Sequence, residues 1–238
     1  MHNAGASISK LTGVILAGGL GTRLRDTLPD RPKVMGEING RPFISFLLDQ
    51  LYDAKIKKVV LCTGYMAKFV ESLLGDTYKD LEIIYSMEHK PLGTGGALKL
   101  AGQYLDGDSA LVMNGDSFVE CDVQRLLSWH VKKKASVSIV LACVDNVSRF
   151  GSIKINTGNE VTRFVEKGNV SDAGLINAGV YLMQPEAVDA IPCEKPFSLE
   201  KQYFPSLVGS GLYGYQTSGR FIDIGTPESF VKAQSFFS

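Results

Sequence analysis

The feature that most constrains the fold is an alternation of short apolar runs with helical stripes through the first 140 residues. Five runs predict buried strands, at residues 13–17, 58–64, 81–86, 110–116 and 136–142. We expect a helix to start at Pro42, because apolar residues follow it at the helical spacing i, i+3, i+4 and i+7, at Ile44, Leu47, Leu48 and Leu51. Repeated strand–helix–strand units form right-handed crossovers. The sequence therefore predicts an α/β fold of three layers, α/β/α, around a mostly parallel central sheet.

The pattern changes after residue 145. Two alternating runs flank Thr157-Gly158-Asn159, which predicts a β-hairpin. A strand over 176–183, short helices near 186–191 and 198–208, and a closing helix from about Pro227 follow. We expect this half to be a smaller α+β annex built onto the sheet. With 238 residues, 45% of them hydrophobic, the chain is long enough to form one full hydrophobic core. We therefore expect a single domain over 1–238, with residues 1–11 as a loose extension.

Composition excludes several partners. Basic and acidic residues number 25 each, so no net field attracts nucleic acid or an anionic membrane. No apolar run approaches the ~20 residues of a membrane helix, and the polar start has no signal-peptide pattern. The four cysteines are far apart and include no CxxC pair, which favours reduced thiols over disulfides or a zinc site. We expect a cytoplasmic protein that binds neither nucleic acid nor membrane, and a homo-oligomer stays open.

The stretch VILAGGLGTRL, residues 14–24, places three glycines directly after the first strand. Glycine is costly to order, so the backbone either adopts positive φ there or is approached closely. A P-loop is excluded because no lysine follows the last glycine, and a dinucleotide fingerprint is excluded by Leu24. Two interpretations remain: a tight strand-to-helix turn, or a phosphate site in which backbone N–H groups and Arg23 face a ligand at the strand's carboxyl end.

Carboxylates stand at two further strand ends. Asp116 closes Asn114-Gly115-Asp116 directly after a strand, and Asp223 lies inside an apolar run. A half-buried carboxylate needs a partner, and a divalent cation is one. A helix N-cap for Asp116 and an Asx turn for Asp223 are the structural alternatives. Lys33, directly after Pro32, is a second candidate phosphate-binding cation, with a solvated turn lysine as its alternative.

Seven segments together resemble the sugar nucleotidyltransferase family in order and spacing. They are LAGGLGTR (16–23), PK (32–33), LGTGGAL (92–98), NGD (114–116), EKG (166–168), NAGVY (177–181) and DIGTPE (223–228). The resemblance covers 13–236 and is closest to the small D-glycero-α-D-manno-heptose 1-phosphate guanylyltransferases. It implies the Rossmann-like nucleotide-diphospho-sugar transferase fold, with the annex binding sugar. Val34 and Gly168 depart from the family, which usually has proline at both positions, and this weakens the subfamily assignment.

The reaction implied by the resemblance is nucleotidyl transfer from a nucleoside triphosphate, GTP, to a sugar 1-phosphate, the heptose, giving GDP-heptose and pyrophosphate for bacterial surface polysaccharide. A phosphate monoester has a second pKa of about 6, so this nucleophile needs no general base. His2, His89 and His130 are accordingly given no catalytic role. The alternatives are mannose-1-phosphate guanylyltransferase, a transferase using UTP, dTTP or CTP, and a non-catalytic nucleotide-sugar-binding module. A glycosyltransferase is disfavoured because DxD is missing at NGDSF, and a bifunctional enzyme is not expected because no hexapeptide repeats follow.

The resemblance also assigns the site. Asp116 and Asp223 would hold Mg²⁺, Arg23 would align the triphosphate and Lys33 would stabilise the transition state, so these four are the predicted catalytic residues. Predicted nucleotide-binding residues are Leu16, Ala17, Gly18, Gly19, Gly21, Thr22, Arg23, Gly93, Thr94 and Gly95. Predicted sugar-phosphate-binding residues are Asn114, Gly115, Glu166, Lys167 and Asn177. An ordinary glycine-rich helix start at 93–95 and ordinary hairpin charges are the structural alternatives.

Overall fold

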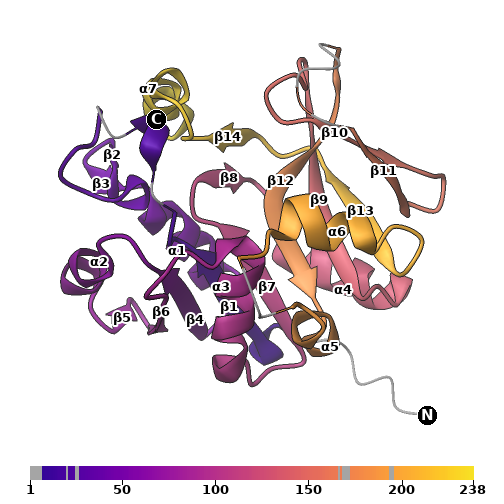
Figure 1. Ribbon diagram of the computed structural model, residues 1–238, viewed down its shortest axis with the longest axis horizontal. Helices are drawn as coiled ribbons and strands as arrows, with labels where there is room; N and C mark the ends of the chain where they lie inside the picture. The colour runs from indigo at the N-terminus through magenta and orange to yellow at the C-terminus, as the bar shows by residue number, and fades with distance from the viewer. Residues whose placement is uncertain (1–6, 20, 25–26, 166, 168–171, 193–195) are drawn as a thin grey trace.

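An eight-stranded sheet runs through the computed structural model, which describes residues 7–19, 21–24, 27–165, 167, 172–192 and 196–238. The strand order is β13 (Leu212–Thr217), β9 (Val137–Val144), β12 (Gly174–Met183), β7 (Ser109–Asn114), β1 (Leu11–Leu16), β4 (Lys58–Thr63), β6 (Leu81–Met87) and β5 (Thr77–Tyr78) (Figure 1). Only β12 and β5 run antiparallel to their neighbours. The mostly parallel sheet is confirmed, and β12 and β13 of the expected annex join it.

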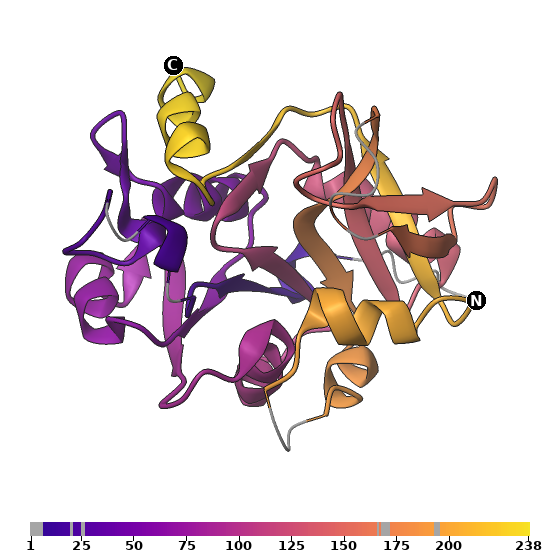
Figure 2. The ribbon, with the colours of Figure 1, turned by 45° about the horizontal axis from the view of Figure 1, so that its top comes forward.

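Helices cover both faces of the sheet, which confirms the three layers. Alternate residues of a strand point to opposite faces, and Val14 and Ile15 accordingly belong to different core clusters. One cluster includes residues of α1 (Ile44–Asp53), α2 (Ala67–Leu74) and α4 (Val123–Lys133). The other includes α3 (Gly93–Ala101), α5 (Pro185–Asp189) and α6 (Phe204–Ser206). Figure 2 shows α1 and α3 on opposite sides of the sheet.

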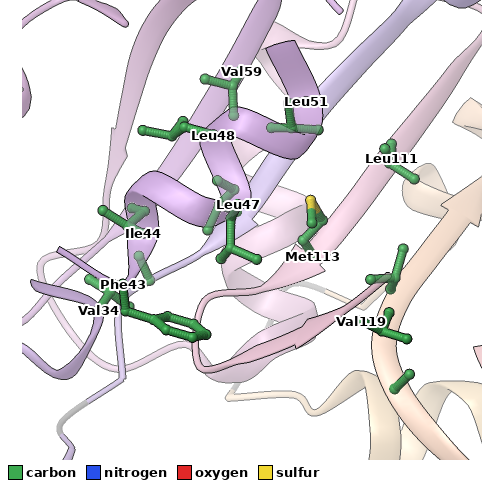
Figure 3. Packing of buried hydrophobic residues seen from close by; sticks show 14 of the residues in the cluster. Val34, Phe43, Ile44, Leu47, Leu48, Leu51, Val59, Leu111, Met113 and Val119 are labelled. Atoms are coloured by element: carbon green, nitrogen blue, oxygen red, sulfur yellow. The ribbon is translucent and has the colours of Figure 1, made fainter. Parts of the chain in front are cut away.

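Helix α1 shows how the stripe becomes packing. Ile44, Leu47, Leu48 and Leu51 are completely buried against the sheet residues Val59, Leu111 and Met113 (Figure 3). Burying one such side chain stabilises the fold by about 1.5–3 kcal/mol. The predicted helix is confirmed, but Pro42 does not begin it: Pro42 lies in β3 (Arg41–Pro42), which pairs with β2 (Glu37–Ile38), two residues before the helix.

The second half contains the predicted hairpin, β10 (Ser152–Ile155) with β11 (Val161–Val165). A second small pair joins β8 (Ser117–Val119) to β14 (Phe221–Asp223), and α7 (Pro227–Phe236) closes the chain behind the N-cap Thr226. Residues 1–6 of the expected loose extension lie outside the described residues, and its last four belong to regular elements. Ile8–Lys10 form a 3₁₀ turn, and Leu11 is already a buried residue of β1. No helix in the described ranges is both long enough and apolar enough to cross a membrane.

The order in which the strands are added to the sheet reverses at β1. From β1 the chain continues to β4 and β6 on one side, and α3 then returns it to β7 on the other side. There the Gly115 N–H donates to the Leu16 carbonyl at 2.9 Å. A Cβ at Gly115 would lie 2.7 Å from that oxygen, so only glycine allows the two backbone segments to approach this closely. Open α/β sheets bind ligands outside the strand carboxyl ends at such a switch point.

Candidate functional site

A cavity of about 340 Å³ opens at the carboxyl ends of β1 and β7. Among its lining residues are ten of those predicted from the sequence: Leu16, Ala17, Gly18, Gly19, Lys33, Gly93, Thr94, Asn114, Gly115 and Asp116. Two carboxylates that the sequence analysis did not single out, Glu88 and Glu200, also line it. The structure thus brings segments from four distant parts of the chain to one hollow.

The glycines of the first loop serve different purposes. Gly21 has φ +59°, in the left-handed region that glycine tolerates. A Cβ at Gly18 would lie 2.8 Å from Glu88 Oε1, whereas Gly19 is exposed with nothing within 4 Å of that position. Thr22 and Arg23 follow in the exposed turn η2 (Thr22–Leu24), and Arg23 does not line the cavity. Within the described ranges no carboxylate pairs with Arg23.

Lys33 is not a solvated turn lysine. It begins the turn η3 (Lys33–Met35), whose Val34 and Met35 are buried. Only 17% of the Lys33 side chain is exposed, and its Nζ lies 2.5 Å from Asp116 Oδ2. Asp116 does not cap a helix, since it lies in the turn between β7 and β8 and Asp122 caps the following helix. The pair holds a carboxylate and an ammonium group side by side at the cavity wall.

Asp223 does not line the cavity, but the backbone brings it beside Asp116 from the other end of the chain. The pairing of β14 with β8 sets Asp223 opposite Ser117, and the Ile224 N–H donates to the Asp116 carbonyl at 2.9 Å. The Asp223 carboxylate accepts hydrogen bonds from Arg149 Nη2, at 3.2 Å to each oxygen, and from the Gly225 N–H at 3.0 Å. The Asx-type turn is therefore present, and Arg149 is a further cation that the sequence analysis missed.

Asp116 and Asp223 are the candidate metal ligands, and each of them is already paired with a cation. The described residues contain no group of three or more His, Cys, Asp or Glu side chains that would form a protein-only cage. Mg²⁺ usually takes one or two carboxylates and completes its shell with water and substrate phosphates. Asp116 and Asp223 fit that donor set, and Lys33 and Arg149 lie where phosphate charge would need compensation.

Glu88 stands one residue beyond β6, so the strand-end rule that found Asp116 would have found it too. Its Oε2 accepts the Leu92 N–H at 3.0 Å. Burial raises the pKa of Glu88, and the Leu92 hydrogen bond acts in the opposite direction. No basic side chain in the described part of the chain forms an ion pair with it.

The second glycine loop is packed against protein. Gly93 has φ +74°, and a Cβ there would lie 2.6 Å from the Phe197 carbonyl oxygen. The Gly95 N–H donates to that same oxygen at 2.8 Å, so it is not available to a nucleotide. Thr94 Oγ1 donates to Glu200 Oε2 at 2.7 Å and accepts the Leu199 N–H at 2.9 Å. Of the predicted nucleotide residues 93–95, only Gly93 and Thr94 line the cavity.

The predicted acceptor residues are placed unevenly. Asn177 does not line the cavity, because its Nδ2 donates to Tyr181 Oη at 3.0 Å and its Oδ1 accepts the Gly179 N–H at 2.8 Å. An irregularity in β12 between Asn177 and Tyr181, with Gly179 at φ +78°, makes these contacts possible. Lys167 is exposed in a turn. Glu166 lies outside the described residues.

Comparison with known proteins agrees with this geometry. Residues 12–238 match the family model of nucleotidyl transferases. D-glycero-alpha-D-manno-heptose 1-phosphate guanylyltransferase of Aneurinibacillus thermoaerophilus is 33% identical over 94% of this chain and 97% of its own length. Mannose-1-phosphate guanylyltransferase of Mycobacterium tuberculosis is 35% identical over 95% of this chain, which spans 64% of that relative. The crystal structure of HddC from Yersinia pseudotuberculosis complexed with GMP-PN superposes with TM-score 0.84 at 35% identity, covering 95% and 99% of the two chains. The chain belongs to the nucleotidyl transferase family.

Proposed function

We propose that this protein transfers a guanylyl group from GTP to D-glycero-α-D-manno-heptose 1-phosphate with the aid of Mg²⁺, releasing pyrophosphate. The observation that carries the proposal is the ion pair of Lys33 with Asp116 at the switch point of the sheet, where the backbone N–H that follows Asp223 is bonded to the Asp116 carbonyl. Both reactants are anions, so the reaction needs charge neutralisation and alignment above all. The relative named for this reaction matches along 97% of its length, which supports the choice of sugar.

The sugar phosphate supplies an ionised nucleophile, since the second pKa of a phosphate monoester is about 6. No general base is needed, and neither described histidine lines the cavity. Lys33 donates to the α-phosphate as charge accumulates there, and Arg23 holds the leaving pyrophosphate through paired N–H donors. Asp116 and Asp223 would hold the Mg²⁺ ion, which when bound would supply Lewis-acid neutralisation of the phosphates.

Glu88 supports guanine as the base. A carboxylate only accepts hydrogen bonds, and its two oxygens suit two neighbouring donors. Guanine presents such a pair, N1–H and the 2-amino group, on its Watson–Crick edge. Glu88 lines the cavity beside Gly18 and has no cation to neutralise it within the described ranges. GTP is therefore the triphosphate we propose.

Mannose 1-phosphate is the second candidate acceptor. It rests on the relatives named as mannose-1-phosphate guanylyltransferases, which are 34–36% identical to the chain. Both candidate reactions join two water-soluble reactants into a soluble nucleotide sugar. We place the reaction in the cytoplasm, upstream of sugar transfer to a bacterial surface polysaccharide.

A pyrophosphate-release screen tests the function. GTP, CTP, UTP, dTTP and ATP are each combined with heptose, mannose and glucose 1-phosphates, with and without a chelator of Mg²⁺. We expect the highest kcat/KM for GTP with the heptose phosphate, and loss of activity in the chelator that added Mg²⁺ restores. A higher value for mannose 1-phosphate selects the second candidate. Absence of pyrophosphate from every pair contradicts the proposed function.

A further inference from the structure

Glu200 is a cavity-lining carboxylate without an assigned role. It lies in the π-helical turn η5 (Leu199–Tyr203), and such turns are frequent at functional sites. Its Oε2 accepts short hydrogen bonds from Thr94 Oγ1 at 2.7 Å and Ser198 Oγ at 3.0 Å. Among the described residues its Oε1 has two contacts, both long, 3.3 Å to Tyr181 Oη and 3.4 Å to Asn114 Nδ2. Oε2 is thus committed to the protein, while Oε1 retains capacity for a ligand donor.

Charge decides which part of a ligand can face Glu200. Asp116 is paired with Lys33 and Asp223 with Arg149, but no basic side chain among the described residues pairs with Glu200. An uncompensated carboxylate repels phosphate at short range. In a site for phosphorylated reactants it must therefore lie against an uncharged, donor-rich group, and sugar hydroxyls are such groups.

The strand order decides which reactant that is. Glu88 follows β6, the pair Lys33–Asp116 lies at β1 and β7, and Glu200 contacts Asn114 of β7 and Tyr181 of β12. Because the order across the sheet is β12-β7-β1-β4-β6, Glu200 and Glu88 lie on opposite sides of the phosphate-binding residues. With the base at Glu88, the reactant at Glu200 is the acceptor sugar. Asn114 Oδ1, which is buried and has no partner in the described part of the chain, lies on the same side.

We propose that Glu200 is a specificity-determining residue for the acceptor, accepting a hydrogen bond through Oε1 from one ring hydroxyl of the sugar 1-phosphate. The inference rests on the proposed function and names the part of the substrate that is recognised. Tyr181 is its positioning residue: the completely buried Tyr181 hydroxyl accepts from Asn114 and Asn177 and donates to Glu200. This gives the Asn177–Tyr181 segment a role in holding Glu200.

Glu200→Gln keeps the shape of the side chain and removes its charge. We expect KM for mannose 1-phosphate, or for the heptose phosphate if that is the better acceptor, to rise about 10- to 100-fold, the range for a hydrogen bond to a charged group. KM for GTP and the melting temperature remain as in wild type. KM is then measured for the 2-, 3-, 4- and 6-deoxy analogues of mannose 1-phosphate. For one of these analogues, the one that lacks the hydroxyl bound by Glu200, KM should be equally high in wild type and in Glu200→Gln. Glu71→Gln, an exposed glutamate of α2, is the matched control and should behave as wild type.

Calorimetric titration of mannose 1-phosphate and the heptose phosphate separates this inference from the proposed function. Wild type that binds a sugar phosphate without releasing pyrophosphate contradicts the function, and the deoxy series measured by binding still tests Glu200. Equal losses for every deoxy analogue in both proteins, a change in KM for GTP alone, or no sugar-phosphate binding at all overturns the inference. If Glu200→Gln does not fold, Tyr181→Phe removes the donor to Oε1 and should raise the same KM several-fold without loss of the deoxy pattern.

Discussion

The two glycine-rich segments, residues 18–21 and 93–96, look alike in sequence and differ in structure. In the first, Gly19 is exposed and a side chain there would meet nothing within 4 Å. In the second, side chains at Gly93 and Gly95 would meet the backbone oxygen of Phe197 at 2.6 and 3.0 Å. The first segment leaves space for a ligand, and the second leaves space for another part of the same chain.

The comparison teaches that a glycine run does not say what occupies the space it leaves. Gly18 shows both cases at once, since its missing side chain admits the Glu88 carboxylate, which in turn faces the cavity. Substitutions separate the two uses, because a protein-filled space is measured by stability and a ligand-filled space by kinetics.

The largest expected effect is in the second segment. Gly93→Ala combines a φ of +74° with a contact of 2.6 Å to the Phe197 oxygen. We expect it to lower the free energy of unfolding by about 2–5 kcal/mol, the sum of left-handed strain and overpacking. Gly209→Ala is the matched control, since Gly209 has φ +79° and open space, and it should lose only the strain of about 1–2 kcal/mol. The free energies are measured by urea unfolding. An equal loss in the two variants would show that the backbone at Phe197 shifts to accept the added methyl group.

The acids beside the first segment give the next largest effect. Asp116→Asn and Asp223→Asn should each lower kcat at least about 100-fold while the melting temperature changes little, because a central electrostatic stabiliser is lost. Pyrophosphate release at saturating substrates and Mg²⁺ is the measurement. Asp108→Asn, an exposed acid paired with Lys10, is the control. Near-normal kcat in both variants would show that neither acid takes part in the phosphate chemistry proposed beside the first segment.

Substitution of Glu88 tests whether the space beside Gly18 holds a carboxylate that recognises the guanine base. Wild type should prefer GTP to ITP, which lacks the 2-amino donor, by about 10-fold in kcat/KM, the value of one such hydrogen bond. Glu88→Gln should reduce that ratio to near one. The pKa of Glu88 is raised, so its charged form is lost as the pH falls through that raised value, and the GTP preference falls with it. The ratio cancels titration of the triphosphate common to both nucleotides. A ratio that stays constant with pH in wild type contradicts this assignment.

The smallest effect is expected at Gly19. Because its surroundings are open, Gly19→Ala should leave the free energy of unfolding within about 0.5 kcal/mol of wild type. KM for GTP should rise several-fold, since the added methyl group occupies space proposed for the nucleotide. Gly40→Ala, at another open glycine outside the cavity, should leave KM unchanged. An unchanged KM for Gly19→Ala would mean that the first segment is also only a turn.

Much of the fold follows from local patterns. The alternation of strands with striped helices is a short-range signal, and it gave β1, β4, β6, β7 and β9 together with α1 at nearly their observed positions. What could not be read is how distant strands pair. The insertion of β12 between β7 and β9 depends on contacts between residues at least thirty positions apart.

The candidate site divides in the same way. Lys33 and Asp116 stand at strand ends and turns, so the sequence could place them near one another, and the structure joins them. Asn177 was expected to face sugar, but the left-handed Gly179 in an irregular strand commits its amide to Tyr181 and the backbone. Arg149 and Glu200 had no local signal, because their roles arise only when the loop before β10 and the turn after α5 fold back over the sheet.

The pairing of Lys33 with Asp116 and of Arg149 with Asp223 would couple the binding of the proposed metal to the binding of the nucleotide. A dication bound by the two acids would release both bases, which could then turn toward phosphate oxygens. The metal ion and the nucleotide would therefore each increase the affinity for the other, and by thermodynamic reciprocity the increase in affinity is the same in either order of addition. Since the chain as a whole carries equal numbers of acidic and basic residues, this exchange of partners at close contact, rather than long-range attraction, would govern how the triphosphate binds.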